Sequence, residues 1–520
     1  MKQNLLAAVS AAGLLALPAP ALAQHASHGG MTMPMPPTAK KKAAAKKAPS
    51  RKAAPKKRAS KSASPTPKKE AESMASEPSA TAPVAPMDHS KMDHSPMSPP
   101  SSTTAPVLAP PAVDHTAMGH SAMPETEHGG HQSVPGALGP YPMTREASGT
   151  AWQPDSSTHM GYMRQSGEWV LMGHGVLNLV HSTQGGPRGD DKTFVSGMLM
   201  GMARRPVGNG ILQMKGMVSP DPLMGKSGYP LLLASGETAN GVDRLVDRQH
   251  PHDFFMELSA SISQNIGPKS SIFLYGGLPG EPAFGPPAFM HREAILDSPE
   301  APISHHWLDS THITFGVVTA GLIVDRVKVE ISRFNAREPD EHRWNIETGP
   351  LDSTAVRISW NPTSDLSLQG SWGKFKDPEQ LEPGVDQTRW SASALLAKEI
   401  APDVKVAATL AWGRKSIKHH EEWWNDDAYV AEASVKHQGW TMFGRGEITE
   451  NRELLEEEEH EAFRVGKISV GAVRDFQIAE HVSFGLGGLF AINFVPDGLS
   501  SLYGGKNPTG AMGFVRLRLN

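Results

Sequence analysis

The sequence has 520 residues and carries 50 basic against 54 acidic side chains, for a formal net charge of −4. It contains no cysteine, which excludes disulfides, thiolate metal sites and cysteine nucleophiles, so any metal must be held by His, Met, Asp or Glu. The near-neutral total hides an asymmetry, because thirteen of the basic residues lie between Lys40 and Lys69 and leave the rest of the chain acidic.

Residues 1–23 have the pattern of a secretory signal peptide. Lys2 supplies the positive end, Leu5–Leu17 is apolar, and the small residues Ala21 and Ala23 precede a cleavage site. No later segment offers the roughly 20 consecutive apolar residues of a membrane-spanning helix. We therefore expect an exported protein without a helical anchor.

Residues 24–150 are rich in Ala, Pro, Ser, Lys, Met and His and nearly free of aromatic residues. This composition predicts a disordered tail. Its basic stretch, Lys40–Lys69, could bind peptidoglycan, another anionic envelope polymer or lipid head groups, and a solvated spacer is an equally good interpretation. Export makes nucleic acid an unsuitable partner.

Short phrases of methionine and histidine recur within this tail. MDHS occurs at 87–90 and again at 92–95, DHTAMGHSAM follows at 114–123, and EHGGH at 127–131. Thioether and imidazole are copper ligands, and Cu(I) in particular accepts Met sulfur, whereas a biased linker gives no reason for repeating the two together. The candidate ligands for Cu(I) or Cu(II) are Met87, His89, Met92, His94, Met97, His115, Met118, His120, Met123, His128 and His131. No organic cofactor is expected.

From about Glu168 onwards, the sequence consists of segments that alternate apolar with polar residues. In VKVEIS, for example, Val327, Val329 and Ile331 fall on one side and two charged residues on the other. A period of two predicts β-strands. We expect sixteen, at 168–180, 193–204, 210–219, 254–265, 270–278, 311–319, 323–334, 353–360, 365–374, 389–399, 403–413, 428–437, 440–449, 463–474, 481–494 and 510–519.

The connections between these strands alternate between short and long. Short turns such as 205–209 and 266–269 are followed by long loops such as 220–253 and 279–310, and tryptophans fall near strand ends. This layout is typical of outer-membrane barrels. We predict an all-β protein, in which residues 151–520 form a transmembrane antiparallel barrel of about 16 strands in the outer membrane of a Gram-negative bacterium, with the tail in the periplasm. A soluble β-sandwich is the alternative.

Two of the long loops are rich in histidine. One ends in VDRQHPHDFF and the other carries FMHRE and PISHHWLDSTH, and because they flank one hairpin we expect them to meet at one rim of the barrel. Imidazole with carboxylate suits Cu(II), Zn, Ni or Co. The candidate ligands are His250, His252, Asp253, His291, His305, His306, Asp309 and His312. An equally good interpretation is a polar network with nearby Arg and Glu that pins the loops into the lumen.

Other patterns give weaker signals. The loops at 418–427 and 453–461 mix His with acids and are interpreted as solvated. Met198, Met200 and Met202 form a period-two stripe, which a lipid-facing surface explains better than a thioether ladder. No G-x-S-x-G motif is present, so we do not expect an enzyme.

Two resemblances follow from these motifs. The phrases MDHSKMDHSPM and DHTAMGHSAM resemble the Met/His-rich segments of periplasmic and outer-membrane copper-resistance proteins, including the copper-resistance B family, and imply copper binding by the tail. The phrases DRQHPHDFF and EAPISHHWLDSTHITFG resemble an uncharacterised group of proteobacterial outer-membrane proteins. The barrel motifs of the copper-resistance B family are missing from this sequence.

The leading functional hypothesis is a barrel that handles copper or a related divalent metal in resistance or transport. A general or substrate-specific porin is one alternative. A structural barrel that anchors the envelope without a metal role is another. Outer-membrane lipid and metal ions are the expected partners, and the sequence leaves the oligomeric state open.

Overall fold

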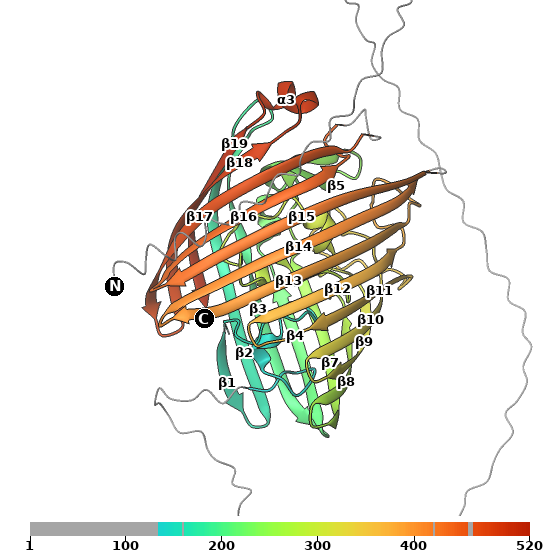
Figure 1. The fold of residues 1–520 in the computed structure, drawn as a ribbon, viewed down its shortest axis with the longest axis vertical. Coiled ribbons are helices and arrows are strands. Elements are labelled where there is room, and N and C mark those ends of the chain that lie inside the picture. The colour runs from blue at the N-terminus through green and yellow to red at the C-terminus, as the bar shows by residue number, and fades with distance from the viewer. Residues whose placement is uncertain (1–133, 159–160, 420–421, 456–460, 520) are drawn as a thin grey trace, which may run out of the picture. The chain divides into compact units, whose positions relative to one another are not determined.

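The computed structural model of the protein describes residues 134–158, 161–419, 422–455 and 461–519. In this described part, sixteen strands form one closed antiparallel ring, which closes where β2 pairs with β19 (Figure 1). The strands of the ring are β2 (Trp169–Gln184), β3 (Asp191–Val207), β4 (Gly210–Val218), β7 (Phe255–Gly267), β8 (Ser270–Gly277), β9 (Val317–Val324), β10 (Val327–Phe334), β11 (Ser353–Trp360), β12 (Leu366–Phe375), β13 (Gln387–Ala401), β14 (Val404–His419), β15 (Glu422–His437), β16 (Trp440–Asn451), β17 (Phe463–Ala479), β18 (Val482–Phe494) and β19 (Thr509–Leu519).

The predicted barrel is confirmed, but several predicted strand bounds are wrong. β14 runs on to His419 and β15 begins at Glu422, so most of the predicted loop 418–427 is strand. Residues predicted as a strand from 311 begin instead in the 3-10 helix η5 (Ser310–His312), and β9 starts only at Val317. The following turn falls at Asp325, whose φ of 53° is left-handed, inside the predicted strand 323–334. The stretch 311–316 alternates like a strand in sequence, but all of its side chains are buried, because it lies inside the ring and has no lipid-facing side.

The wall of the barrel is apolar outside and polar inside. On β10, Val329 and Ile331 are 43% and 51% exposed, whereas Lys328 and Glu330 next to them are 0% and 1% exposed. Exposed tryptophans such as Trp440 lie near strand ends. An apolar band with aromatic edges matches a hydrocarbon environment, and a closed ring leaves no unpaired strand edge within it. The protein is therefore a transmembrane barrel of the outer membrane, in contact with its lipid.

The methionine stripe on β3 faces the lumen, so the lipid-facing interpretation is wrong. Met198 is 4% exposed, whereas Leu199 beside it is 57% exposed on the outer surface. Met198 packs with Met217, Met256 and other apolar side chains inside the ring. Alternation by itself cannot tell which side of a barrel strand faces inward, since either side can carry apolar residues.

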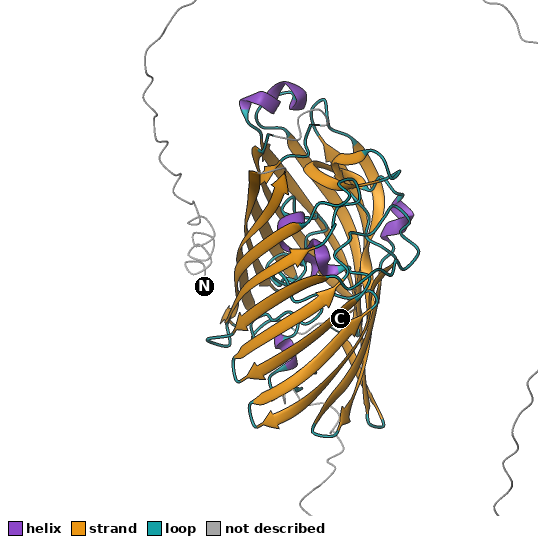
Figure 2. Ribbon diagram, turned by 90° about the vertical axis from the view of Figure 1, so that its right-hand side faces the viewer, coloured by secondary structure: helices purple, strands orange, loops and turns teal. Residues whose placement is uncertain are grey.

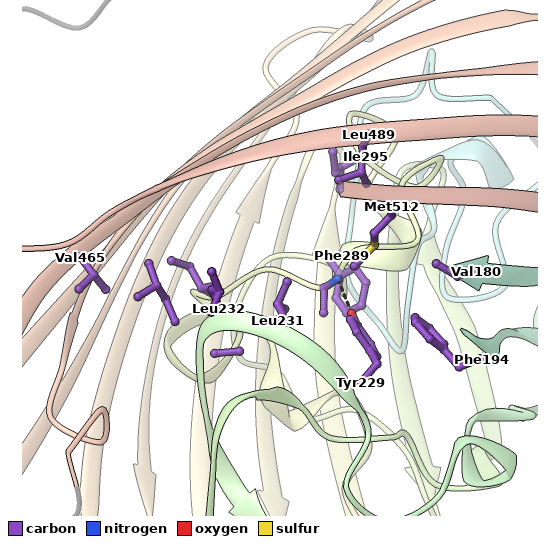
Figure 3. Close-up of a cluster of buried hydrophobic side chains, with 14 of the residues drawn as sticks. Val180, Phe194, Tyr229, Leu231, Leu232, Phe289, Ile295, Val465, Leu489 and Met512 are labelled. Carbon is purple, nitrogen blue, oxygen red and sulfur yellow. Dashed lines mark hydrogen bonds between the residues drawn. The ribbon is translucent and has the colours of Figure 1, made fainter. Parts of the chain in front are cut away.

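Two long connections fold into the lumen (Figure 2). The connection from β4 to β7 contains η3 (Asp221–Met224) and the hairpin of β5 (Tyr229–Thr238) and β6 (Arg244–Gln249). The connection from β8 to β9 contains η4 (Phe289–His291), α2 (His305–Leu308) and η5. Apolar residues of both connections pack with wall residues in one buried cluster, which includes Leu231, Leu232, Phe289, Val465 and Met512 (Figure 3).

Residues 134–158, here called the N-terminal segment, also lie within the ring, at the end of the short turns. The wall residues Ser263 and Ser271 donate hydrogen bonds of 2.7 Å to the carbonyls of Ala137 and Leu138. The segment contains the short helix η2 (Met143–Arg145).

This packing corrects the expected extent of the tail. The sequence pattern places residues 134–150 in the tail, but Arg357 of the wall donates a hydrogen bond of 2.9 Å to Thr150, and Lys328 donates to the Thr150 carbonyl. Tyr141 and Trp152 are buried against each other with their ring centroids 5.2 Å apart. The sequence from residue 24 to residue 133 contains no aromatic side chain, in contrast to this segment.

The remaining elements lie outside the ring's own pairing. β1 (Tyr162–Ser166) forms a short hairpin with the start of β2, and α3 (Asp497–Tyr503) lies in the connection between β18 and β19. Among the described residues, no helix combines the length and apolar character needed to cross a membrane.

Candidate functional site

Five of the predicted loop histidines meet in one buried group, here called the histidine cluster. Its members are His250, His252, His305, His306 and His312. The ring of His312 lies 5.1 Å from that of His252 and 5.2 Å from that of His305, measured between centroids. His250 lies 5.6 Å from His306 and 6.0 Å from His305. The expected convergence of the two loops is confirmed, although the cluster is buried in the lumen and not exposed at a rim.

Each imidazole is oriented by an oxygen atom. His305 begins α2 and Asp309 directly follows its last residue, and Nδ1 of His305 donates to the Asp309 carboxylate at 2.8 Å. Nδ1 of His312 donates to the Asp309 carbonyl at 2.7 Å. Nδ1 of His252 donates at 2.8 Å to Asp221, which η3 presents. These three contacts fix the tautomer and leave Nε2 as the acceptor. His250 differs, because its Nε2 lies 3.0 Å from the Glu237 carboxylate.

The Nε2 atoms of His252 and His312 are buried and have no hydrogen-bond partner among the described residues. Burial, with a smaller contribution from the neighbouring histidines, holds the pKa of His312 well below its usual value, and burial also lowers the pKa of His305. The rings of His305 and His312 are therefore neutral at physiological pH, which is the form that binds a metal ion.

His306 differs from the other members because it is paired with an anion. Its Nδ1 lies 3.1 Å from the Glu338 carboxylate. Burial lowers its pKa, but the charge of Glu338 outweighs burial and raises the pKa to about 9. His306, Glu338 and Glu379 bring three potential ligand atoms within 4.8 Å of one another. A protonated imidazole cannot coordinate an ion, so this trio acts as an ion pair unless a metal displaces the proton.

Arginine–carboxylate pairs surround the cluster, as the polar-network interpretation expects. Arg292 donates two hydrogen bonds of 2.8 Å to Glu432 of β15 and one of 2.5 Å to Asp309. Arg343 pairs with Asp253 at 3.2 Å and with Glu237. Asp253 therefore serves this network, and its side chain makes no hydrogen bond to a histidine among the described residues.

His291 does not join the histidine cluster. Its ring lies 6.3 Å from that of His174 on β2, a residue that the loop-based prediction did not include. The sequence prediction also missed Asp221, Glu237 and Glu338, which orient the cluster, because isolated acids in long loops carry no motif. The tail candidates from Met87 to His131 lie outside the described residues.

Among solved structures, the chain resembles outer-membrane channels. OmpF of Salmonella typhi in complex with daunomycin is 12% identical, with a TM-score of 0.44, over 69% of this chain and 100% of that one. DcaP of Acinetobacter baumannii is 9% identical, with a TM-score of 0.40, over 69% and 100%. An anion-selective porin from Comamonas acidovorans is 12% identical, with a TM-score of 0.39, over 68% and 100%. Neither a protein-family model nor a curated protein sequence matches the chain.

Proposed function

We propose that the protein is an outer-membrane channel of the porin class whose passage is restricted by loops folded into the lumen. The observation that carries the proposal is that the connection from β8 to β9 reaches the far wall. Arg292 binds Glu432 on β15, and Ser304 donates a 2.8 Å hydrogen bond to Glu447 on β16. A polar lumen narrowed by inward loops favours a substrate-specific channel over a wide general pore.

Conductance in planar lipid bilayers tests this proposal. The full-length protein should give small, discrete channel openings, and Arg292→Ala should enlarge them because the loop loses its contact with the wall. Arg205→Ala is the control, since Arg205 pairs with the exposed Glu168 and not with a lumenal loop. Absence of conductance in the wild type and in Arg292→Ala would reject the channel.

A second candidate function is the handling of copper or a related metal ion. It is supported by the three imidazoles of His252, His305 and His312, whose Nδ1 atoms are engaged. Rings about 5 Å apart are compatible with two imidazoles on one ion at Zn–N distances of about 2.0 Å. Zn²⁺ or Cu²⁺ should then raise the melting temperature of the wild type but not of His312→Leu. An equal rise in both proteins would assign the metal to another part of the chain.

Binding of copper by the tail and of peptidoglycan by Lys40–Lys69 remain predictions. Deletion of residues 87–131 should reduce copper binding by several equivalents if the Met/His phrases hold metal. Neutralisation of the basic stretch should abolish co-sedimentation with peptidoglycan if the envelope-anchor hypothesis is correct.

A further inference from the structure

A cavity of about 100 Å³ lies between the N-terminal segment and the wall, and thioether and imidazole groups line it. The residues with such side chains are Met143, Met172, His174, Met200, Met202 and His291. They come from four parts of the chain, namely η2, β2, β3 and η4. The cavity is separate from the histidine cluster, which contributes no residue to its lining.

The pairing of β2 with β3 explains why these side chains gather. Met172 is directly opposite Met202, and His174 is directly opposite Met200. Directly opposed residues of an antiparallel pair have Cβ atoms about 4.5–5.5 Å apart on the same face. That face is lumenal, because His174 is 7% exposed whereas Leu171 on the other face is 41% exposed.

His291 joins the group from η4, in the connection between β8 and β9. Its Nε2 atom is buried and has no hydrogen-bond partner among the described residues. Its ring centroid lies 6.3 Å from that of His174, with the two rings nearly perpendicular.

Three charged residues also line the cavity, namely Lys215, Glu146 and Glu293, and each has partners of its own. Lys215, which also lines it, lies 3.2 Å from Glu257 and donates a hydrogen bond to the Gly149 carbonyl. Glu293 lies 3.0 Å from Lys436, and Glu146 accepts hydrogen bonds from the backbone of Ala137 and Leu138 and from the Tyr141 hydroxyl. The thioether sulfur atoms are uncharged, and thioether sulfur prefers soft ions.

Packing in an apolar cluster accounts for Met198 and Met217 and also contributes at Met200, but it does not account for Met172 and Met202. Met198 and Met217 lie in an apolar cluster with Ile313 and Phe315, where a flexible side chain fills space. Met172 and Met202 instead border a cavity that two histidines share. If these side chains only filled space, nothing would require two imidazoles among them.

We propose that this cavity is a binding site for a soft monovalent metal ion, Cu(I) by chemical class, with ligands drawn from Met172, His174, Met200, Met202 and His291. The proposal goes beyond channel function. It also differs from the divalent site considered for the histidine cluster.

Ag(I), a redox-inert analogue of Cu(I), provides the test. The full-length protein, labelled with ¹³C at the methionine methyl groups, is folded in detergent and titrated with Ag(I) by NMR. Met172→Leu, Met200→Leu and Met202→Leu assign the three cavity signals. These signals should shift with Ag(I), and the double variant Met172→Leu/Met202→Leu should weaken the effect at Met200 at least about tenfold, in line with the loss expected on disrupting a metal site.

Met214→Leu is the matched control. Met214 lies on β4 of the same wall but is 44% exposed on the outer surface, so Ag(I) should shift the cavity signals of this variant as in the wild type. Should the double variant fail to fold, Met202→Leu alone gives the same comparison. Shifts confined to methionines other than these three, with the cavity signals unchanged, would overturn the proposal. The channel hypothesis is tested by conductance without metal, so either can fail alone.

Discussion

The lumen contains two groups of potential metal ligands that differ in their charge. Near the short turns, Met172, Met202 and His291 surround a cavity without a charged partner of their own. Nearer the long loops, His306 is ion-paired with Glu338, and Arg292 pairs with Asp309, which also accepts the hydrogen bond of His305. The comparison shows that imidazole in one barrel can be a neutral donor in one place and part of an ion-pair network in another. The charge of the group that contacts the imidazole determines which of the two roles it takes.

The largest expected loss of stability comes from removing one partner of a buried ion pair near the long loops. Glu432→Gln leaves the guanidinium of Arg292, which is fully buried, with only Asp309 as a charged partner. Removal of one partner of a buried ion pair costs about 3–5 kcal/mol. Urea unfolding, followed by tryptophan fluorescence, should show this loss. Glu168→Gln, which affects a largely exposed pair with Arg205, should show almost none. Equal midpoints for the two variants would contradict the network.

A smaller loss of stability is expected from a change in the N-terminal segment, which lines the methionine-containing cavity. Arg145 is buried, donates hydrogen bonds of 2.6 and 2.8 Å to Asp155, and lies over the rings of Tyr141 and Trp152. Arg145→Gln should cost about 2 kcal/mol, because hydrogen bonds between charged groups contribute about 1.5–3 kcal/mol. Limited proteolysis should then cleave the segment faster. Arg164→Gln, on the exposed β1, is the control, and equal cleavage of both would contradict the role of Arg145.

The methionine cavity itself should contribute little to stability. Met172→Leu/Met202→Leu conserves volume, and such swaps cost less than about 1.5 kcal/mol each. We therefore expect the unfolding midpoint of the double variant to stay near that of the wild type while Ag(I) binding falls. A large loss of stability without a change in Ag(I) binding would show that these side chains only pack.

The last expected effect is a pH dependence at His306, which is read as a local change in fluorescence. Its pKa is about 9 in the folded protein, above the ordinary value of about 6.5. The stabilisation is thus complete below about pH 6.5 and is lost as the pH rises through about 9. Fluorescence of the neighbouring Trp307 should report the change between pH 7 and 10. Glu338→Gln should abolish it, and persistence of the transition in that variant would assign it to another group.

The strand pattern could be predicted from sequence to a large extent. Period-two alternation in segments such as 327–334 located all sixteen strands of the ring. The pattern predicted a strand at 311–316, where the alternating residues are in fact all buried. It also gave the wrong orientation for Met198–Met202, because both faces of that strand are apolar. A pattern of this kind reports which residues share a side but not which side is the lumen.

The candidate site was predictable only in part. The motifs VDRQHPHDFF and PISHHWLDSTH identified all five members of the histidine cluster, because histidine is rare enough for its recurrence in two loops to be noticed. His291 was assigned to the wrong group, since its position beside His174 depends on how the loop crosses the lumen. Asp221 and Glu338 come from separate connections that meet only after folding.

The sequence by itself determined export, the strands and the closed barrel, because these depend on local composition and on a period that successive residues carry. Only the tertiary structure decided what fills the barrel. The inward folding of residues 278–316 and the seating of the N-terminal segment bring together side chains far apart in the chain. Hydrogen-bond partners and burial then set their charge, and neither quantity is a property of any one segment of the sequence.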